Sequence, residues 1–161
     1  MTLTAHRVLE DCELAVAEFA PTDDAALWRR RWIAGLTLLR TVGHVLDKVD
    51  GESDASLRVA IDDWWNGLRN TPEAHPIFWK FINEERNSIV KEYRSRGVHV
   101  LRSTVRFSMA TGRQLEETTT HLTVIQGGHY DGRSQVEVGR EAVAWWHEQL
   151  RAIERGVSGA A

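Results

Sequence analysis

Apolar residues recur every three or four positions through the first part of the chain, which is the spacing of one face of an amphipathic α-helix. The pattern is interrupted at Pro21, Gly51, Pro72 and Gly97. It predicts four helices, over about residues 4–19, 22–49, 57–68 and 76–93. Each helix has one apolar face to bury, so the four are expected to pack together as an up-and-down bundle.

Polar residues before two of these helices have the character of helix caps. Asp23 and Asp24 precede the second helix, where the positive end of the helix dipole favours negative charge. Ser53 and Asp54 precede the third, and either side chain suits its N-cap. Gly51 is expected to end the second helix.

After Gly97 the apolar residues alternate instead, as in a β-strand. Two strands are predicted, over about residues 98–109 and 117–125, joined by residues 110–113. The second strand is dense in β-branched residues, which favour extended structure. Ser134 and Glu137 then form a capping box for a last helix. Its apolar stripe should pack back on the bundle and consists of Val136, Val143, Trp146, Leu150 and Ile153.

These elements predict a single, predominantly α domain over residues 1–161, or α+β if the hairpin is counted. Its parts are a helical bundle over 1–97, a β-hairpin region over 98–132, a C-terminal helix over 133–155 and a flexible tail over 156–161.

Composition excludes several classes of protein. The single cysteine, Cys12, rules out an intramolecular disulfide and lies among apolar helix positions, as a core residue would. No apolar run approaches the ~20 residues that span a bilayer, and residues 1–7 lack the features of a signal peptide, so we expect a cytoplasmic protein with no membrane partner. A formal net charge of -3 argues against a broad nucleic-acid surface but leaves room for a local basic site at Arg29-Arg30-Arg31 or Arg94-Ser95-Arg96.

Arg86 interrupts the apolar stripe of the fourth helix. It falls between Ile82 and Ile89, at the spacing where another apolar residue is expected. A guanidinium keeps its proton even when it is buried, so it needs a carboxylate, backbone carbonyls or an anionic ligand as partner. We therefore expect Arg86 either to pair with an acidic residue such as Asp47 or Glu85, or to bind an anion such as an RNA phosphate.

The segment Arg86-Asn87-Ser88-Ile89-Val90-Lys91-Glu92-Tyr93 resembles the signature of HEPN domains, compact helical modules of prokaryotic toxins, defence systems and RNA-processing proteins. That family's catalytic pattern is an Arg, often followed by Asn, then four to six residues to a His, with a Tyr two positions later in one toxin branch. Arg86, Asn87 and Tyr93 match, whereas Lys91 stands in place of the His. The resemblance covers mainly residues 22–96 and implies a bundle of four or five helices with the motif near a homodimer interface.

The resemblance also implies a metal-independent ribonuclease, in which catalysis would rest on Arg86, Lys91 and Tyr93. An exposed ammonium holds its proton too strongly near neutral pH to act as an efficient base, so Lys91 replaces the His poorly. The leading expectation is therefore a noncatalytic binding or regulatory module, without a cofactor, whose ligand site uses Arg86, Asn87, Lys91 and Arg94. Its partners would be a second copy of the chain and an RNA or a protein.

Two alternatives remain open at this point: an active endoribonuclease in which Lys91 or His99 replaces the missing His, and a structural or assembly protein that binds through exposed tryptophans and the hairpin edge. A metal site at His99, His121 and His129 lacks close ligand spacing, so no metal is expected. Two tryptophan pairs are assigned mainly to the core, with Trp145 as a candidate interface residue and Asp62-Asp63 on the solvent side of Trp64-Trp65.

Overall fold

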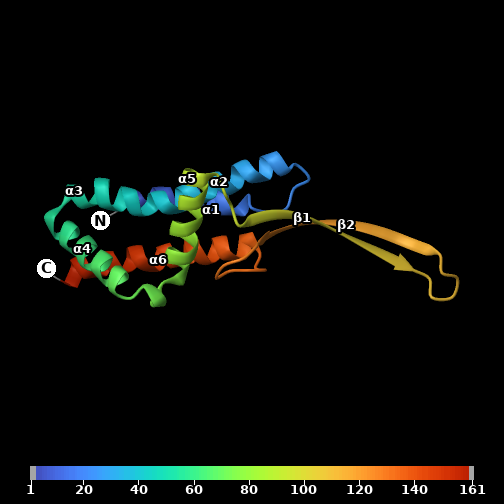
Figure 1. Ribbon diagram of the computed structural model, residues 1–161. Helices are drawn as coiled ribbons and strands as arrows, with labels where there is room; N and C mark the ends of the chain where they lie inside the picture. The colour runs from blue at the N-terminus through green and yellow to red at the C-terminus, as the bar shows by residue number, and fades with distance from the viewer. Residues whose placement is uncertain (1–2, 160–161) are drawn as a thin grey trace.

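The computed structural model describes residues 3–159, with side chains described up to residue 157. Helices form most of the molecule, and a long two-stranded hairpin projects from one end (Figure 1). This confirms the predicted predominantly α fold with a β-hairpin and a final packing helix. The elements are α1 (Thr4–Ala17), α2 (Ala25–Val45), α3 (Gly51–Ser53), α4 (Ala55–Asn70), α5 (Glu84–Glu92), β1 (Gly97–Phe107), β2 (Gln114–Ile125) and α6 (Gln135–Gly159).

The predicted caps start two of the helices. The Asp24 carboxylate accepts hydrogen bonds from the amides of Ala26 and Leu27, both at 2.9 Å, at the beginning of α2. Asp54 accepts one from the Leu57 amide at 2.9 Å and begins α4. Each cap satisfies amides that have no partner within their own helix, which explains why the chain turns into a helix at these points.

Gly51 does not end the second helix, contrary to the sequence prediction. The chain continues from α2 through a π-helical segment, Leu46–Asp50, into the short helix α3. Within this segment the buried Asp50 carboxylate accepts hydrogen bonds from the Thr4 and Ala5 amides, at 2.7 and 2.8 Å. A Cβ at Gly51 would lie 2.7 Å from a guanidinium nitrogen of Arg58, so a larger residue there would require the Arg58 side chain to move.

The core lies between the helices, and α6 runs along α1 and α4 (Figure 1). Cys12 is fully buried, as expected, and burial raises the pKa of its thiol to about 12. The buried face of α6 is broader than predicted, because Trp145 is buried beside Trp146 instead of facing an interface. The Trp145 indole N–H donates to His75 Nδ1 at 3.2 Å.

The hairpin pairs β1 with β2 in antiparallel register, from Gly97 opposite Ile125 to Phe107 opposite Gln114, with an irregularity between Arg106 and Phe107. Its base is fixed to the helices by the fully buried Gln135. The Gln135 amide donates to the carbonyl oxygens of Val98 and Val124, at 3.0 and 2.8 Å, and its own oxygen accepts from the Trp28 indole at 2.9 Å. The rest of the hairpin extends away from the helices (Figure 1).

The sequence predicts a flexible tail from Gly156, whereas α6 continues to Gly159; residues 160 and 161 of that tail lie outside the described residues. None of the helices within residues 3–159 is long and apolar enough to span a bilayer.

Candidate functional site

The predicted burial of Arg86 is wrong by one residue. Glu85 is the buried charge of α5, with 2% of its surface exposed, and Arg86 is only half-buried beside it. The predicted stripe residues Phe78, Ile82 and Ile89 are buried. Residues 85 and 86 each lie three or four positions from both Ile82 and Ile89, so the apolar spacing alone does not decide which of the two is buried.

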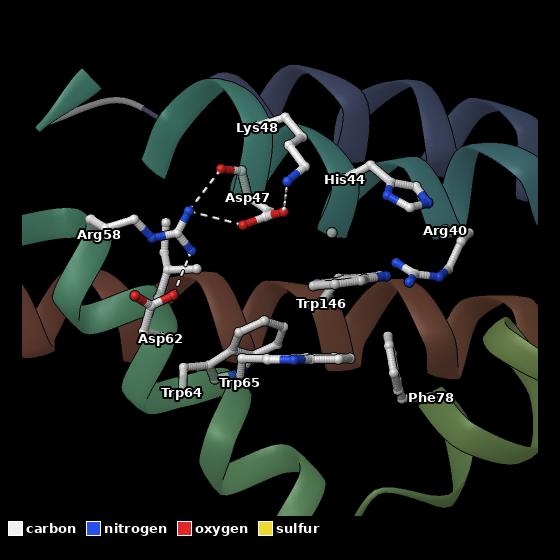
Figure 2. Close-up of a pocket in the computed structure, with 12 residues that line it drawn as sticks. Arg40, His44, Asp47, Lys48, Arg58, Asp62, Trp64, Trp65, Phe78 and Trp146 are labelled. Atoms are coloured by element: carbon white, nitrogen blue, oxygen red, sulfur yellow. Dashed lines mark hydrogen bonds and ion pairs between the residues drawn. The ribbon is translucent and has the colours of Figure 1, made fainter. Parts of the chain in front are cut away.

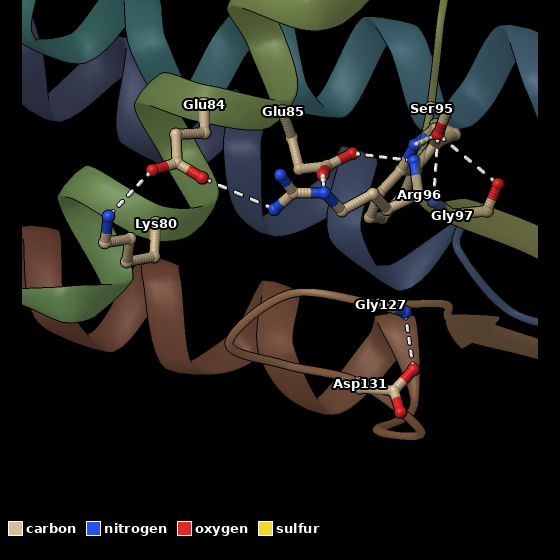
Figure 3. Close-up of polar contacts among 9 residues, drawn as sticks. Lys80, Glu84, Glu85, Ser95, Arg96, Gly97, Gly127 and Asp131 are labelled. Atoms are coloured by element: carbon tan, nitrogen blue, oxygen red, sulfur yellow. Dashed lines mark hydrogen bonds and ion pairs between the residues drawn. The ribbon is translucent and has the colours of Figure 1, made fainter.

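Glu85 has a structural role that the sequence did not show. It accepts a hydrogen bond from the Arg96 amide at 3.1 Å, and the Arg96 guanidinium lies 3.6 Å away (Figure 3). Burial raises the pKa of the Glu85 carboxyl, against the opposing effect of Arg96. The Arg96 guanidinium also lies 3.3 Å from Glu84, so these contacts tie α5 to the beginning of β1.

The other residues of the predicted site do not converge on Arg86. Asn87 is the exception, since its side-chain oxygen accepts a hydrogen bond from Arg86 at 3.1 Å. Lys91 follows Arg86 by five residues, which is ~140° around an α-helix, and its side chain is exposed. Tyr93 ends α5 in the left-handed conformation at φ 54° and is exposed, and Arg94 pairs with Glu92 at 3.3 Å. The HEPN-like motif is thus helical but dispersed over the surface.

A cavity of about 320 Å³ opens between α2, α4, α6 and the π-helical segment Ile77–Asn83 before α5 (Figure 2). Its aromatic wall consists of Trp64, Trp65, Phe78 and Trp146. Two of these rings are fixed by hydrogen bonds, from the Trp146 indole to the Leu39 carbonyl at 2.8 Å and from the Trp64 indole to Gln149 at 3.0 Å. The wall is therefore a positioned apolar surface, consistent with a ligand site.

One end of the cavity is electrically balanced. The Arg58 guanidinium donates to the Asp47 carboxylate at 2.9 Å and to Asp62 at 2.7 Å, and Lys48 pairs with Asp47 at 3.0 Å (Figure 2). The hydrogen bonds from Lys48 and Arg58 hold the pKa of Asp47 below its usual value. Both carboxylates of the cavity are therefore already engaged, and Asp47 does not pair with Arg86 as the sequence had suggested.

The other end carries unbalanced positive charge. Arg40 reaches over the Phe78 ring, with its guanidinium carbon 5.6 Å from the ring centre, beside Trp146 (Figure 2). Burial and then the neighbouring charge of Arg86 lower the pKa of Arg40. Burial, Arg40 and Arg86 in turn lower the pKa of His44, which lies one helical turn after Arg40. We call Arg40, His44 and Arg86 the cationic cluster.

Among the ion pairs of residues 3–157, none involves Arg40 or Arg86. Arg40 and Arg86 are both half-buried and repel each other, which is unfavourable unless an anion neutralises them. The cluster therefore has the electrostatic character of an anion site at the end of an aromatic cavity. The spacing of Arg40 and His44 places them on one side of α2, but nothing local in the sequence predicts that α5 brings Arg86 to them.

The remaining candidate residues are the three histidines of the hairpin region and the pair Trp64 and Trp65. His99 and His121 meet across the hairpin, with their ring nitrogens 3.3 Å apart. His129 does not join them: within the part of the chain that the structure describes, no three side chains of the metal-binding types form a group. Trp64 and Trp65 are half-buried and pack against the core, with Asp62 and Asp63 exposed beside them, and both rings also line the cavity.

Comparison of the chain with protein-family models, with curated proteins and with solved structures gives no match. Function is therefore argued from the residues themselves, above all from the cationic cluster and the aromatic wall.

Proposed function

We propose that this protein is a noncatalytic, HEPN-like RNA-binding module that holds a nucleotide of single-stranded RNA at the cavity between α2, α4 and α6. The observation that supports this proposal is Arg40, which lines the cavity beside the aromatic wall and is acted on by the charge of Arg86, while neither arginine pairs with a carboxylate. A phosphate would neutralise the two guanidinium groups, and a base would lie against Trp64, Trp65 or Trp146.

The chemistry of the site favours RNA over a protein partner. Single-stranded RNA is bound by a combination of cationic groups, which contact phosphates, and aromatic rings, on which bases stack. An acidic peptide would satisfy the arginines but would make less use of three indole rings. The formal charge of -3 limits binding through the general surface, so a local site must provide the affinity. The volume of about 320 Å³ is at the lower end of the range for small-molecule sites, which suits one nucleotide rather than a folded RNA.

Binding of a fluorescein-labelled, single-stranded RNA, followed by fluorescence anisotropy at low salt, tests the proposal. Arg40→Gln and Arg86→Gln are each expected to weaken binding about tenfold, which corresponds to about 1.4 kcal/mol. Lys91→Gln is the matched control, since it removes a cation from the same helix as Arg86 but outside the cavity. Its binding should change little.

Equal weakening by Lys91→Gln and Arg86→Gln would overturn the cavity as the site and would favour a diffuse basic surface. Thermal unfolding of each variant provides the second measurement. An Arg86→Gln protein that binds poorly and also unfolds at a much lower temperature would indicate that Arg86 stabilises the bundle instead of binding a ligand.

A metal-independent ribonuclease is the second candidate, and one observation favours it. Burial, and then the charges of Arg40 and Arg86, lower the pKa of His44, so its imidazole is neutral near pH 7, as a general base must be. His44 of α2 would then provide the His that the motif lacks at Lys91. It would take the proton of a ribose 2'-hydroxyl while Arg86 stabilised charge on the phosphate.

For this second candidate we expect cleavage of a mixed RNA pool in excess chelator, with loss of activity in His44→Gln and Arg86→Gln but not in Lys91→Gln. Because the pKa of His44 is lowered, the rate should rise with pH below about 6.5 and level off above it. Wild-type protein that leaves the RNA intact at every pH would reject this candidate and leave the binding module.

A further inference from the structure

The distal part of the hairpin is exposed on both faces. Residues 100–107 of β1 and 114–120 of β2 are all exposed, and Leu101, Val105 and Phe107 are exposed apolar residues on one face. A two-stranded hairpin on its own is marginally stable in water, and a free strand edge is a template for another strand. An extension of this length therefore favours a partner that completes the sheet.

Hydrogen bonds at the base of the hairpin show which backbone amides and carbonyls of β2 point away from β1. The Ile125 amide donates to the Arg133 carbonyl at 2.9 Å, and the Ile125 carbonyl accepts from the Gly132 amide at 2.8 Å. Both groups therefore point away from β1. Since backbone direction alternates along an antiparallel strand, Glu117, Thr119 and His121 also direct their amides and carbonyls outward. Farther toward the base the edge is occupied, because Ser134 bridges to Val124.

We propose that two copies of this chain associate by antiparallel pairing of their β2 edges, centred on Thr119, to form a continuous four-stranded sheet. Thr119 is the middle of the three residues with outward groups, so this register joins all of them to equivalent groups of the second copy. A two-fold axis through the pair makes the contact self-complementary, which closes the assembly as a dimer.

Charge complementarity selects this register and this occupant. Antiparallel pairing about Thr119 places Glu117 directly opposite His121 of the second copy, and His121 opposite the other Glu117. It also places Thr118 opposite Thr120. A carboxylate facing an imidazole, and paired threonines, stabilise a sheet at directly facing positions. In the single chain Glu117 accepts from Gln114 at 3.5 Å and His121 Nδ1 lies 3.3 Å from His99 Nε2, so the second copy would add a further partner to each.

The β1 edge does not offer the same match. The charged residues on its exposed part, Arg102 and Arg106, are both positive. Two β1 strands side by side would bring these arginines of both copies together, with only Arg106 offset by a carboxylate, Glu116 at 3.4 Å, which opposes association. The β1 edge thus remains at the outside of the proposed sheet, where its arginines help to prevent further strand addition.

Sedimentation equilibrium of the full chain, over a range of protein concentrations, tests the proposal with two matched variants. Thr119→Pro removes an outward amide from β2, and Ser103→Pro removes one from β1; the two residues face each other in the hairpin, so each variant perturbs the same position of the sheet. We expect wild type and Ser103→Pro to approach twice the 18.3 kDa chain mass, and Thr119→Pro to remain monomeric. Thermal unfolding of the helices verifies that both variants are folded.

Charge reversal checks the register. Glu117→Lys should weaken association because it faces His121 of the second copy, and adding His121→Glu to the same chain should restore it by reversing both charges. Monomeric wild type, dimeric Thr119→Pro, equal loss of the dimer in Ser103→Pro, or a double variant as weak as Glu117→Lys would each overturn the proposal.

Discussion

Trp146→Ala is expected to lower the free energy of unfolding by about 3–5 kcal/mol, the usual cost of removing a large aromatic residue from a core. The Trp146 side chain is fully buried, and its ring centre lies 4.8 Å from that of Trp145 and 6.0 Å from those of Trp64 and Phe78. Its truncation would leave a cavity where α6 meets the other helices and would remove the hydrogen bond that the indole N–H donates to the Leu39 carbonyl at 2.8 Å.

Urea unfolding followed by circular dichroism measures this loss, with Trp146→Phe as the matched control. Phenylalanine keeps much of the volume but has no N–H group, so its cost should be smaller than that of alanine. Equal stability of Trp146→Ala and wild type would mean that α6 is not docked on the bundle through this ring. Because Trp146 also forms part of the aromatic wall, Trp146→Phe is the variant of choice for measuring its effect on RNA binding.

The bundle, its caps and the hairpin follow from local features of the sequence. Asp54 caps α4 as predicted, and Asp24, expected as a favourable charge at the start of α2, is its cap, because a cap depends on a residue and the amides two or three positions after it. The strands are recognised by alternation and β-branched residues, which are equally local. In these segments the local preference and the tertiary structure agree.

The prediction fails at two positions that lie beside π-helical segments. At the first segment, Leu46–Asp50, the helix passes on through Gly51 instead of ending there. After the second, Ile77–Asn83, Glu85 is buried and Arg86 only half-buried. Both residues lie three or four positions from the buried Ile82 and Ile89, so a regular period cannot decide between them.

The candidate site could be predicted only in part, because it is assembled from segments distant in sequence: α2, α4, α6 and the π-helical segment that leads into α5. Arg86 stands out as a charge interrupting an apolar stripe, and the tryptophan pairs stand out by composition. The approach of Arg40 and His44 to Arg86 depends on how α2 packs against α5, which no short motif encodes. The resemblance pairs Arg86 with Lys91 of the same helix, whereas the residues on which the charge of Arg86 acts, Arg40 and His44, belong to another helix, α2.

Glu85→Ala is expected to destabilise the protein by about 2–3 kcal/mol, as measured by urea unfolding. The substitution leaves the Arg96 amide without its acceptor and removes a buried side chain. Glu84→Ala is the matched control, because Glu84 also contacts Arg96 but is partly exposed, and such surface pairs contribute at most about 1 kcal/mol. Similar losses in both variants would show that the buried carboxylate has no special role.

Glu85→Gln should have the opposite effect near neutral pH. The pKa of Glu85 is raised above its ordinary value of 4.5 because burial disfavours the carboxylate. The folded state therefore holds the proton more tightly than the unfolded state, and the stability from this group is present below pH 4.5 and lost as the pH rises through the raised pKa. Glutamine keeps the acceptor for the Arg96 amide without a charge to bury. Urea midpoints measured against pH should thus show Glu85→Gln gaining on wild type above pH 4.5. If instead the wild type gains stability relative to Glu85→Gln above pH 4.5, attraction to Arg96 outweighs the cost of burying the carboxylate. The contact between Glu85 and Arg96 would then stabilise the fold through its charge.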